Sequence, residues 1–153
     1  MSRTGEGHGN RLQEVVATEG RELEAAFSRI EAATEPDERR SLVDQVLERL
    51  AAHVAARREV LYPRVSRDVP DGDSVVDLAL LGLAQIERTN KEFAGLSGAE
   101  PTFHHLVTKL AQEVWEHLDE EEDEVLPALV DAIGTDEANE LGDVLARVGA
   151  VVE

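Results

Sequence analysis

Two histidines, each followed four residues later by a charged side chain, lie in distant parts of this 153-residue sequence. His117 precedes Glu121, and His53 precedes Arg57. On a helix, residues four apart project from the same side about one turn from each other, so His117 and Glu121 could chelate one metal ion. The sequence has no cysteine, so any metal would have to be held by imidazole nitrogen and carboxylate oxygen.

The segments around the two histidines resemble each other. Pro63 comes ten residues after His53, Pro127 comes ten residues after His117, and a short apolar segment precedes each proline. Such self-similarity predicts a duplicated helical hairpin, and short connections would make neighbouring helices antiparallel.

The apolar residues recur at helical spacing in four long segments and one short one. Their stripes cover residues 12–30, 42–61, 76–96, 106–128 and 141–148. Polar, Gly- or Pro-containing breaks separate them, at residues 34–37, 68–73, 97–101 and 134–136. We expect the second helix to end near Pro63. Residues 1–10, which include His8, are expected to form a disordered leader, and residues 11–153 a helical domain with a short C-terminal helix.

The composition agrees with one all-α domain and excludes several classes of partner. Hydrophobic residues make up 42% of the chain but aromatic residues only 3%, which is typical of a core built from Leu, Val, Ile and Ala on helices. The formal net charge of -18 repels phosphate backbones and anionic membranes, so neither is an expected partner. With no cysteine and no apolar run long enough to span a bilayer, we expect a cytoplasmic protein.

Polar side chains interrupt the apolar stripes at the two histidine motifs. A carboxylate at the inward position of Glu121 would need a metal, a cation or several hydrogen-bond donors, because burying it alone is costly. The alternatives are that residues 119–124 form a solvated acidic face and that Arg57 extends to solvent beside Arg58. His53 and His117 could likewise be neutral, hydrogen-bonded core residues.

The two motifs resemble the signatures of hemerythrin-like (HHE cation-binding) domains, over roughly residues 12–130. His117 with Glu121 and the following Leu-Pro resembles the second H-x-x-x-E signature, and His53 with Leu61-Tyr62-Pro63 resembles the first. The resemblance implies an antiparallel up-down-up-down four-helix bundle. In that family, one His from each of helices one and three joins an H-x-x-x-E pair from each of helices two and four. This set holds two bridged irons that bind dioxygen or react with oxidants.

The sequence departs from that pattern at three of the six ligand positions. They fall on Gly20, Arg57 and Ile86, or on Glu87 in place of Ile86 if the register differs by one residue. His53, His117 and Glu121 remain as candidate metal ligands. A di-iron site needs both bridging carboxylates and several imidazoles. Arg57 could instead supply the positive charge and pair with Glu121, and Gly20 could leave room for its guanidinium.

These departures favour a non-catalytic regulatory or protein-interaction module without a cofactor, not an enzyme, with an unidentified protein partner and a monomeric or homodimeric state. The alternative is an oxygen- or oxidant-responsive protein that binds iron or another divalent metal through His53, His117, Glu121 and water. An intact di-iron protein would require a different register at the three substituted positions.

Overall fold

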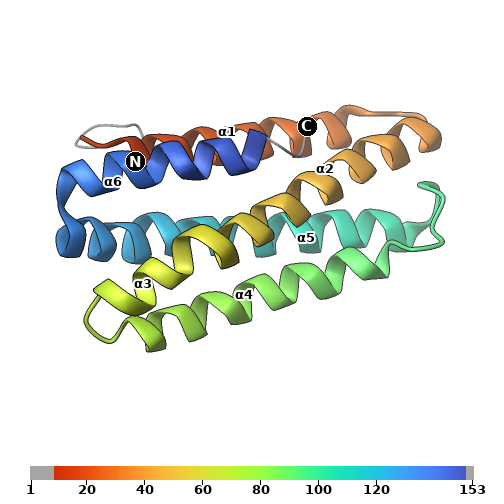
Figure 1. Cartoon of the computed structure of the whole chain (residues 1–153). Helices are drawn as coiled ribbons and strands as arrows, with labels where there is room; N and C mark the ends of the chain where they lie inside the picture. Colours follow the sequence, from red (N-terminus) through yellow and green to blue (C-terminus); the bar gives the residue numbers. More distant parts are fainter. Residues whose placement is uncertain (1–8, 151–153) are drawn as a thin grey trace.

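The computed structural model describes residues 9–150, which are almost entirely helical and contain no strand. Figure 1 shows long helical rods packed side by side, with consecutive rods antiparallel. The elements are, in chain order, α1 (Arg11–Ala32), α2 (Pro36–Ala56), η1 (Arg57–Leu61), α3 (Tyr62–Asp68), α4 (Gly72–Glu92), α5 (Pro101–Glu120), η2 (Glu121–Val125) and α6 (Leu126–Ala150). In chain order the rods are α1, then α2 with η1 and α3, then α4, and then α5 with η2 and the first part of α6. The predicted all-α four-helix bundle is confirmed. The expected leader and His8 lie outside the described residues, except for the last two residues of the leader.

The second and fourth rods each contain a π-helical turn that begins at a motif residue. In η1 the backbone carbonyl of Arg57 accepts a hydrogen bond from the N–H of Tyr62, five residues on, and η2 repeats this pattern from Glu121. Each turn is followed within two residues by a proline, Pro63 or Pro127. Proline cannot donate a backbone hydrogen bond, and its ring crowds the carbonyl four residues earlier. The extra residue of a π turn accommodates this defect, so both rods continue past their prolines.

The expectation that the second helix ends near Pro63 is therefore wrong. The rod continues through α3 to Asp68 and ends at the turn before α4. In the fourth rod the chain continues from η2 into α6 in the same way. Both motifs consequently lie in the interior of a rod, where neighbouring helices cover them, and not at a helix end.

The predicted break near residue 134 is confirmed by a sharp kink in α6. Gly134 has φ 88° and ψ 167°, a conformation that is accessible essentially to glycine alone. After this kink the rest of α6 folds back along α1 (Figure 1) and buries Leu141 and Leu145. Gly142 allows the close approach, because a Cβ atom there would lie 2.5 Å from the backbone nitrogen of Leu12.

The core is aliphatic, as the composition predicted, with a few aromatic contacts between rods. Phe27 on α1 packs edge-to-face against Trp115 on α5 with ring centroids 5.6 Å apart, and Phe93 packs against Phe103 at 5.4 Å. Within residues 9–150, the helices are too short or too polar to cross a bilayer.

Candidate functional site

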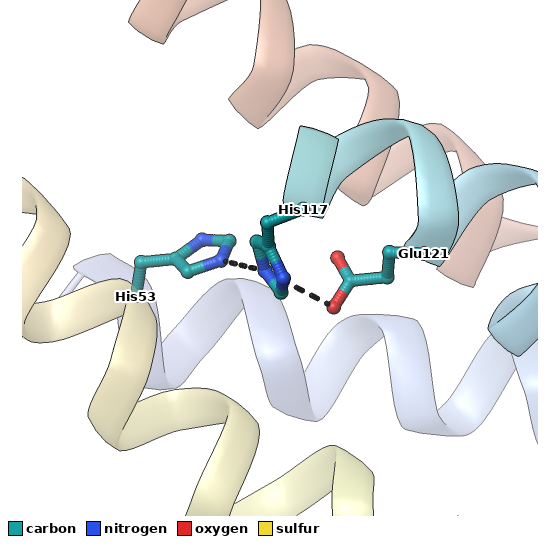
Figure 2. Close-up of side chains that lie close together, drawn as sticks. All are labelled: His53, His117 and Glu121. Carbon is teal, nitrogen blue, oxygen red and sulfur yellow. Dashed lines mark hydrogen bonds and ion pairs between the residues drawn. The ribbon is translucent and has the colours of Figure 1, made fainter. Parts of the chain in front are cut away.

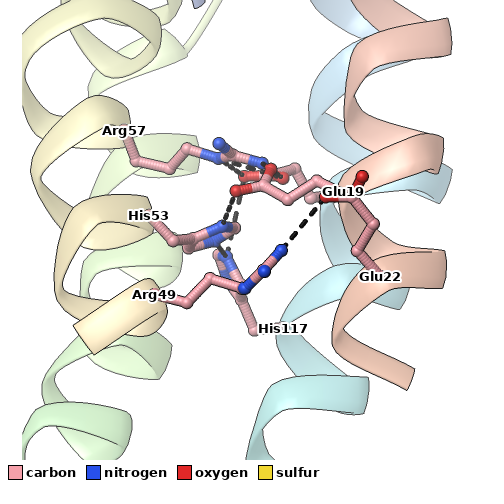
Figure 3. Close-up of polar contacts among 7 residues, drawn as sticks. Glu19, Glu22, Arg49, His53, Arg57 and His117 are labelled. Carbon is pink, nitrogen blue, oxygen red and sulfur yellow. Dashed lines mark hydrogen bonds and ion pairs between the residues drawn. The ribbon is translucent and has the colours of Figure 1, made fainter. Parts of the chain in front are cut away.

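Five polar side chains, from three α-helices and two π turns, meet in the interior of the bundle. They are Glu19 from α1, His53 from α2, Arg57 from η1 and His117 from α5 (Figure 3), with Glu121 from η2. Arg57 and Glu121 are each 1% exposed, His53 2% and His117 4%. Glu19 differs, because its side chain is 23% exposed. The network is therefore buried and reaches solvent through one carboxylate.

Arg57 and Glu121 form the predicted buried ion pair. The guanidinium donates through Nε to Glu121 Oε2 at 2.9 Å and through Nη2 to Oε1 at 2.7 Å, so both carboxylate oxygens accept from it. Burial raises the pKa of Glu121, but the charges of Arg57 and then His117, together with the hydrogen bonds from Arg57, outweigh burial and hold that pKa below its usual range. The alternative in which Arg57 extends to solvent is thus excluded by its position.

Glu19 joins the ion pair to the histidines. Its Oε1 accepts from Arg57 Nη2 at 2.8 Å, and its Oε2 lies 2.8 Å from His53 Nδ1. Burial would raise the pKa of Glu19, yet the charges of Arg57 and then of His53 lower it strongly. The carboxylate is therefore ionised throughout the physiological range.

The two imidazoles contact each other directly. His53 Nε2 lies 2.9 Å from His117 Nε2, and the rings are edge-to-face with centroids 5.0 Å apart. A carboxylate oxygen only accepts, so His53 Nδ1 donates to Glu19. With both rings neutral, His53 Nε2 then accepts from His117 Nε2–H, and His117 Nδ1 carries no proton. Burial lowers the pKa of His117 to about 4, so this ring is neutral at pH 7.

Two buried polar atoms beside this network have no hydrogen-bond partner among the described residues, His117 Nδ1 and the hydroxyl of Tyr62. Burial and then the negative charge of Glu121 raise the pKa of Tyr62, so its hydroxyl keeps its proton. The second nitrogen of a metal-bound histidine almost always donates to a carboxylate, carbonyl or water. Among residues 9–150, His117 Nδ1 has no such partner, whereas His53 Nδ1 has Glu19.

Sequence reasoning missed Glu19, which directly precedes Gly20, the residue assigned to the helix-one ligand position. A Cβ atom at Gly20 would lie 3.7 Å from Leu118 and 3.9 Å from Glu122, with no atom of Arg57 within 4 Å. The idea that Gly20 leaves room for the guanidinium is therefore wrong. The signal for Glu19 was present in the apolar stripe, since Glu19 comes three residues after Val16 and four before Leu23.

Ile86 of α4, the third position assigned to a lost ligand, is completely buried in the aliphatic core, and its neighbour Glu87 pairs with Arg58 at 3.1 Å. The side chain of Glu87 is 40% exposed, so this carboxylate is directed to the surface and not into the network. The assignment of Gly20, Arg57 and Ile86 to family ligand positions remains a prediction from the sequence.

The three candidate metal ligands that the sequence indicated do lie together. Donor atoms of His53, His117 and Glu121 are all within 4.8 Å of one another, and Figure 2 shows the three side chains converging from α2, α5 and η2. Such a buried group of two imidazoles and one carboxylate could hold a metal ion.

Most donor atoms of this group are, however, already engaged by the protein, and His117 Nδ1 is the exception among the described residues. Both oxygens of Glu121 accept from the guanidinium of Arg57, which carries a permanent positive charge. The 2.9 Å between the two Nε2 atoms is a hydrogen-bond distance. Two nitrogens bound to one tetrahedral ion at about 2.1 Å would be about 3.4 Å apart. A metal bound to both Nε2 atoms and to Glu121 would have to separate the rings and lie beside the cationic guanidinium of Arg57, so the arrangement does not fit a di-iron centre.

A surface cleft of about 530 Å³ between α1, α2 and the tail of α6 leads to the network. Glu19, His53 and Arg57 line it, while Arg49 and Glu22, 3.1 Å apart, lie beside them (Figure 3). The network is thus accessible from one side of the bundle.

Comparison with known proteins gives one family and one relative. Residues 11–129 match the family described as the hemerythrin HHE cation binding domain. A protein of Nostoc sp. (strain PCC 7120) named DNA nickase is 24% identical over 131 residues, which cover 84% of this chain but 36% of that protein. The chain therefore spans about a third of the length of this relative. The search of solved structures gave no match.

Proposed function

This chain belongs to the hemerythrin HHE cation-binding domain family, and we propose that it is a member in which an internal arginine has taken the place of the metal centre. It serves, in this proposal, as a non-catalytic regulatory or protein-interaction module. The observation that carries the proposal is the guanidinium of Arg57, which is 1% exposed and donates to both oxygens of Glu121 and to Glu19.

Charge balance supports this replacement. Two carboxylates in a bundle interior need a cation, which a metal ion or an arginine can supply. Arg57 supplies it with charged hydrogen bonds to each of them, at 2.7 Å to Glu121 and 2.8 Å to Glu19. A metal ion beside this guanidinium would experience charge repulsion that lowers its affinity. We therefore do not expect this chain to carry out the reactions that iron supports in this family, because Arg57 lowers the affinity of the site for iron.

The nickase relative does not change this proposal. That name describes a protein almost three times as long as the matched segment, so the name does not assign an activity to the shared region. The net charge of -18 further opposes contact with a phosphate backbone. We therefore propose a basic protein surface, and not DNA, as the partner of this acidic domain.

A second candidate function rests on the group formed by His53, His117 and Glu121. If Arg57 moved aside, these residues could hold one divalent ion, with Glu19 orienting His53 as carboxylates orient metal-bound histidines. The protein would then respond to oxygen or oxidants through iron. The hydrogen bonds of Arg57 to two carboxylates oppose its movement out of the site. Metal binding is therefore the second candidate and not the first.

The decisive measurement is the metal content of protein purified without a chelator, read together with its visible absorption spectrum. We expect metal well below one ion per chain and no absorption from an oxo-bridged iron pair. The matched comparison is Arg57→Gln, which removes the permanent charge but keeps hydrogen-bond donors. It should take up more added ferrous ion than the unaltered protein, since the remaining donors are no longer opposed by a cation.

Two irons per chain in the unaltered protein would overturn the proposal. One ion per chain, lost when His53 or His117 is replaced by Asn, would establish the second candidate instead. Equal iron uptake by the unaltered protein and by Arg57→Gln would show that the guanidinium does not protect the site from metal.

A further inference from the structure

The cleft that leads to the buried network has the size and lining of a small-molecule site. Its volume of about 530 Å³ falls within the range of ligand pockets, roughly 300–1,000 Å³. Val15, Ala52, Ala56 and Leu145 contribute apolar side chains to its lining. The polar groups of the cleft converge at Glu19 and its hydrogen-bonded partners, His53 and Arg57. A ligand with an apolar part and a polar group would fit, with the apolar part against the helices and the polar group at the network.

The arginines at the edge of the cleft are already paired with carboxylates. Arg49 donates to Glu22 at 3.1 Å, and Arg11 donates to Glu14 at 2.8 Å and to Asp143 at 3.1 Å. An anionic ligand would have to break one of these pairs before it gained a cationic partner. The cleft therefore does not favour an anion.

The buried network, by contrast, is short of positive charge. Among the described residues, the single guanidinium of Arg57 donates to two carboxylates, Glu121 and Glu19. Glu121 is 1% exposed, whereas the Glu19 side chain is 23% exposed and lines the cleft. Each oxygen of Glu19 accepts one hydrogen bond within the network and has a further lone pair.

We propose that the cleft binds a small organic cation, a primary alkylamine in its protonated form, with the ammonium on Glu19 and the alkyl chain along α1, α2 and the tail of α6. A metal ion alone would leave the apolar lining and most of the volume unused, and a neutral alcohol would not balance the charge. The inference rests on the proposed function, since it takes Arg57 and not a metal as the resident cation.

The test uses n-butylammonium chloride as the probe and n-butanol as its neutral counterpart, titrated into the full chain at pH 8. A primary alkylamine remains protonated there, because its pKa is close to the value of about 10.4 for lysine. Backbone amide shifts in an NMR spectrum report binding at residues 15–19 and 52–57. We expect saturable shifts with the amine and at least tenfold weaker binding of the alcohol.

Three variants localise the binding. Glu19→Gln should weaken amine binding at least tenfold, because it removes the anchoring charge. Ala52→Leu, which leaves every charge in place and fills the cleft, should weaken it to a similar extent. Glu48→Gln is the matched control, because Glu48 also lines the cleft but is exposed to solvent, and it should change the affinity less than twofold.

Equal losses in Glu19→Gln and Glu48→Gln would mean general attraction to an acidic surface and would overturn the inference. So would unsaturable shifts, or equal affinity for the alcohol. Metal content is measured on the same sample, which separates the two proposals. If the protein contains no metal and does not bind the amine, this inference alone is refuted. If the protein contains bound metal, both the proposed function and this inference are refuted.

Discussion

Replacement of Arg57 by Met should destabilise the protein far more than a surface arginine would. Methionine fills much of the volume of the arginine stem but leaves Glu121, 1% exposed, without the donors that now reach both of its oxygens. Removal of one partner of a buried ion pair typically costs about 3–5 kcal/mol. Glu19 moderates the loss little, because it is itself a carboxylate and keeps its contact with His53.

The assay is urea unfolding followed by circular dichroism at 222 nm, compared at pH 7.5 and pH 5. We expect Arg57→Met to lower the free energy of unfolding by about 3–5 kcal/mol at pH 7.5. The deficit should be smaller at pH 5, because burial raises the pKa of an unpaired Glu121 and protonation removes its charge. The double variant Arg57→Met/Glu121→Leu should recover to within about 1 kcal/mol of the unaltered protein, since an apolar pair often replaces a buried ion pair without loss.

Arg58→Met is the matched control from the same π turn. Arg58 is 45% exposed and pairs with Glu87, which is 40% exposed, so its loss should change stability by less than about 0.5 kcal/mol. The reasoning is refuted if Arg57→Met behaves like this control. It is also refuted if the double variant is as unstable as the sum of its single variants, since the two side chains would then not be coupled.

Three other outcomes are expected. Stability should rise with pH between about 4 and 6.5, because His117 in the folded protein, with a pKa of about 4, stays neutral while the unfolded residue, at 6.5, is protonated. This linkage amounts to about 2 kcal/mol between pH 7 and pH 5 in urea unfolding, and a flat profile would contradict it. Gly134→Ala should cost about 1–3 kcal/mol, measured in the same way, because φ 88° with ψ 167° strains any residue with a Cβ. Finally, Gly20→His, Arg57→Glu and Ile86→His together should gain iron, detected by metal analysis, and a metal-free but folded variant would count against the assigned ligand positions.

The histidine motifs could be placed from the sequence because their neighbours are periodic. His53 and His117 fall within apolar stripes, and Arg57 and Glu121 follow them at the same helical spacing. Burial of all four residues, and the pairing of the arginine with the glutamate, follows from antiparallel rods that carry matching motifs. The ends of the second rod could not be placed as well, because a proline shows where a helix is disturbed and not whether a π turn compensates for it.

The neighbouring residues Glu19 and Gly20 show where the sequence was insufficient. One residue corresponds to a rotation of about 100° around a helix axis, so a small uncertainty in the orientation of α1 exchanges the two positions. The sequence contained a carboxylate at a stripe position, but its partners, His53 and Arg57, come from other rods. Only the packing of the rods decides whether such a carboxylate faces solvent or forms hydrogen bonds with residues of other rods.

By itself, then, the sequence determined the helical bundle, its duplicated halves and the identity of the paired charges, because periodicity and spacing are local properties. Tertiary packing decided that Glu19 completes the network and that the tail of α6 forms one wall of a cleft above it. These features depend on contacts between distant segments, 34 and 38 residues apart for Glu19 with His53 and Arg57, and more than 100 residues apart for α1 with the tail of α6. Local preferences do not encode such contacts.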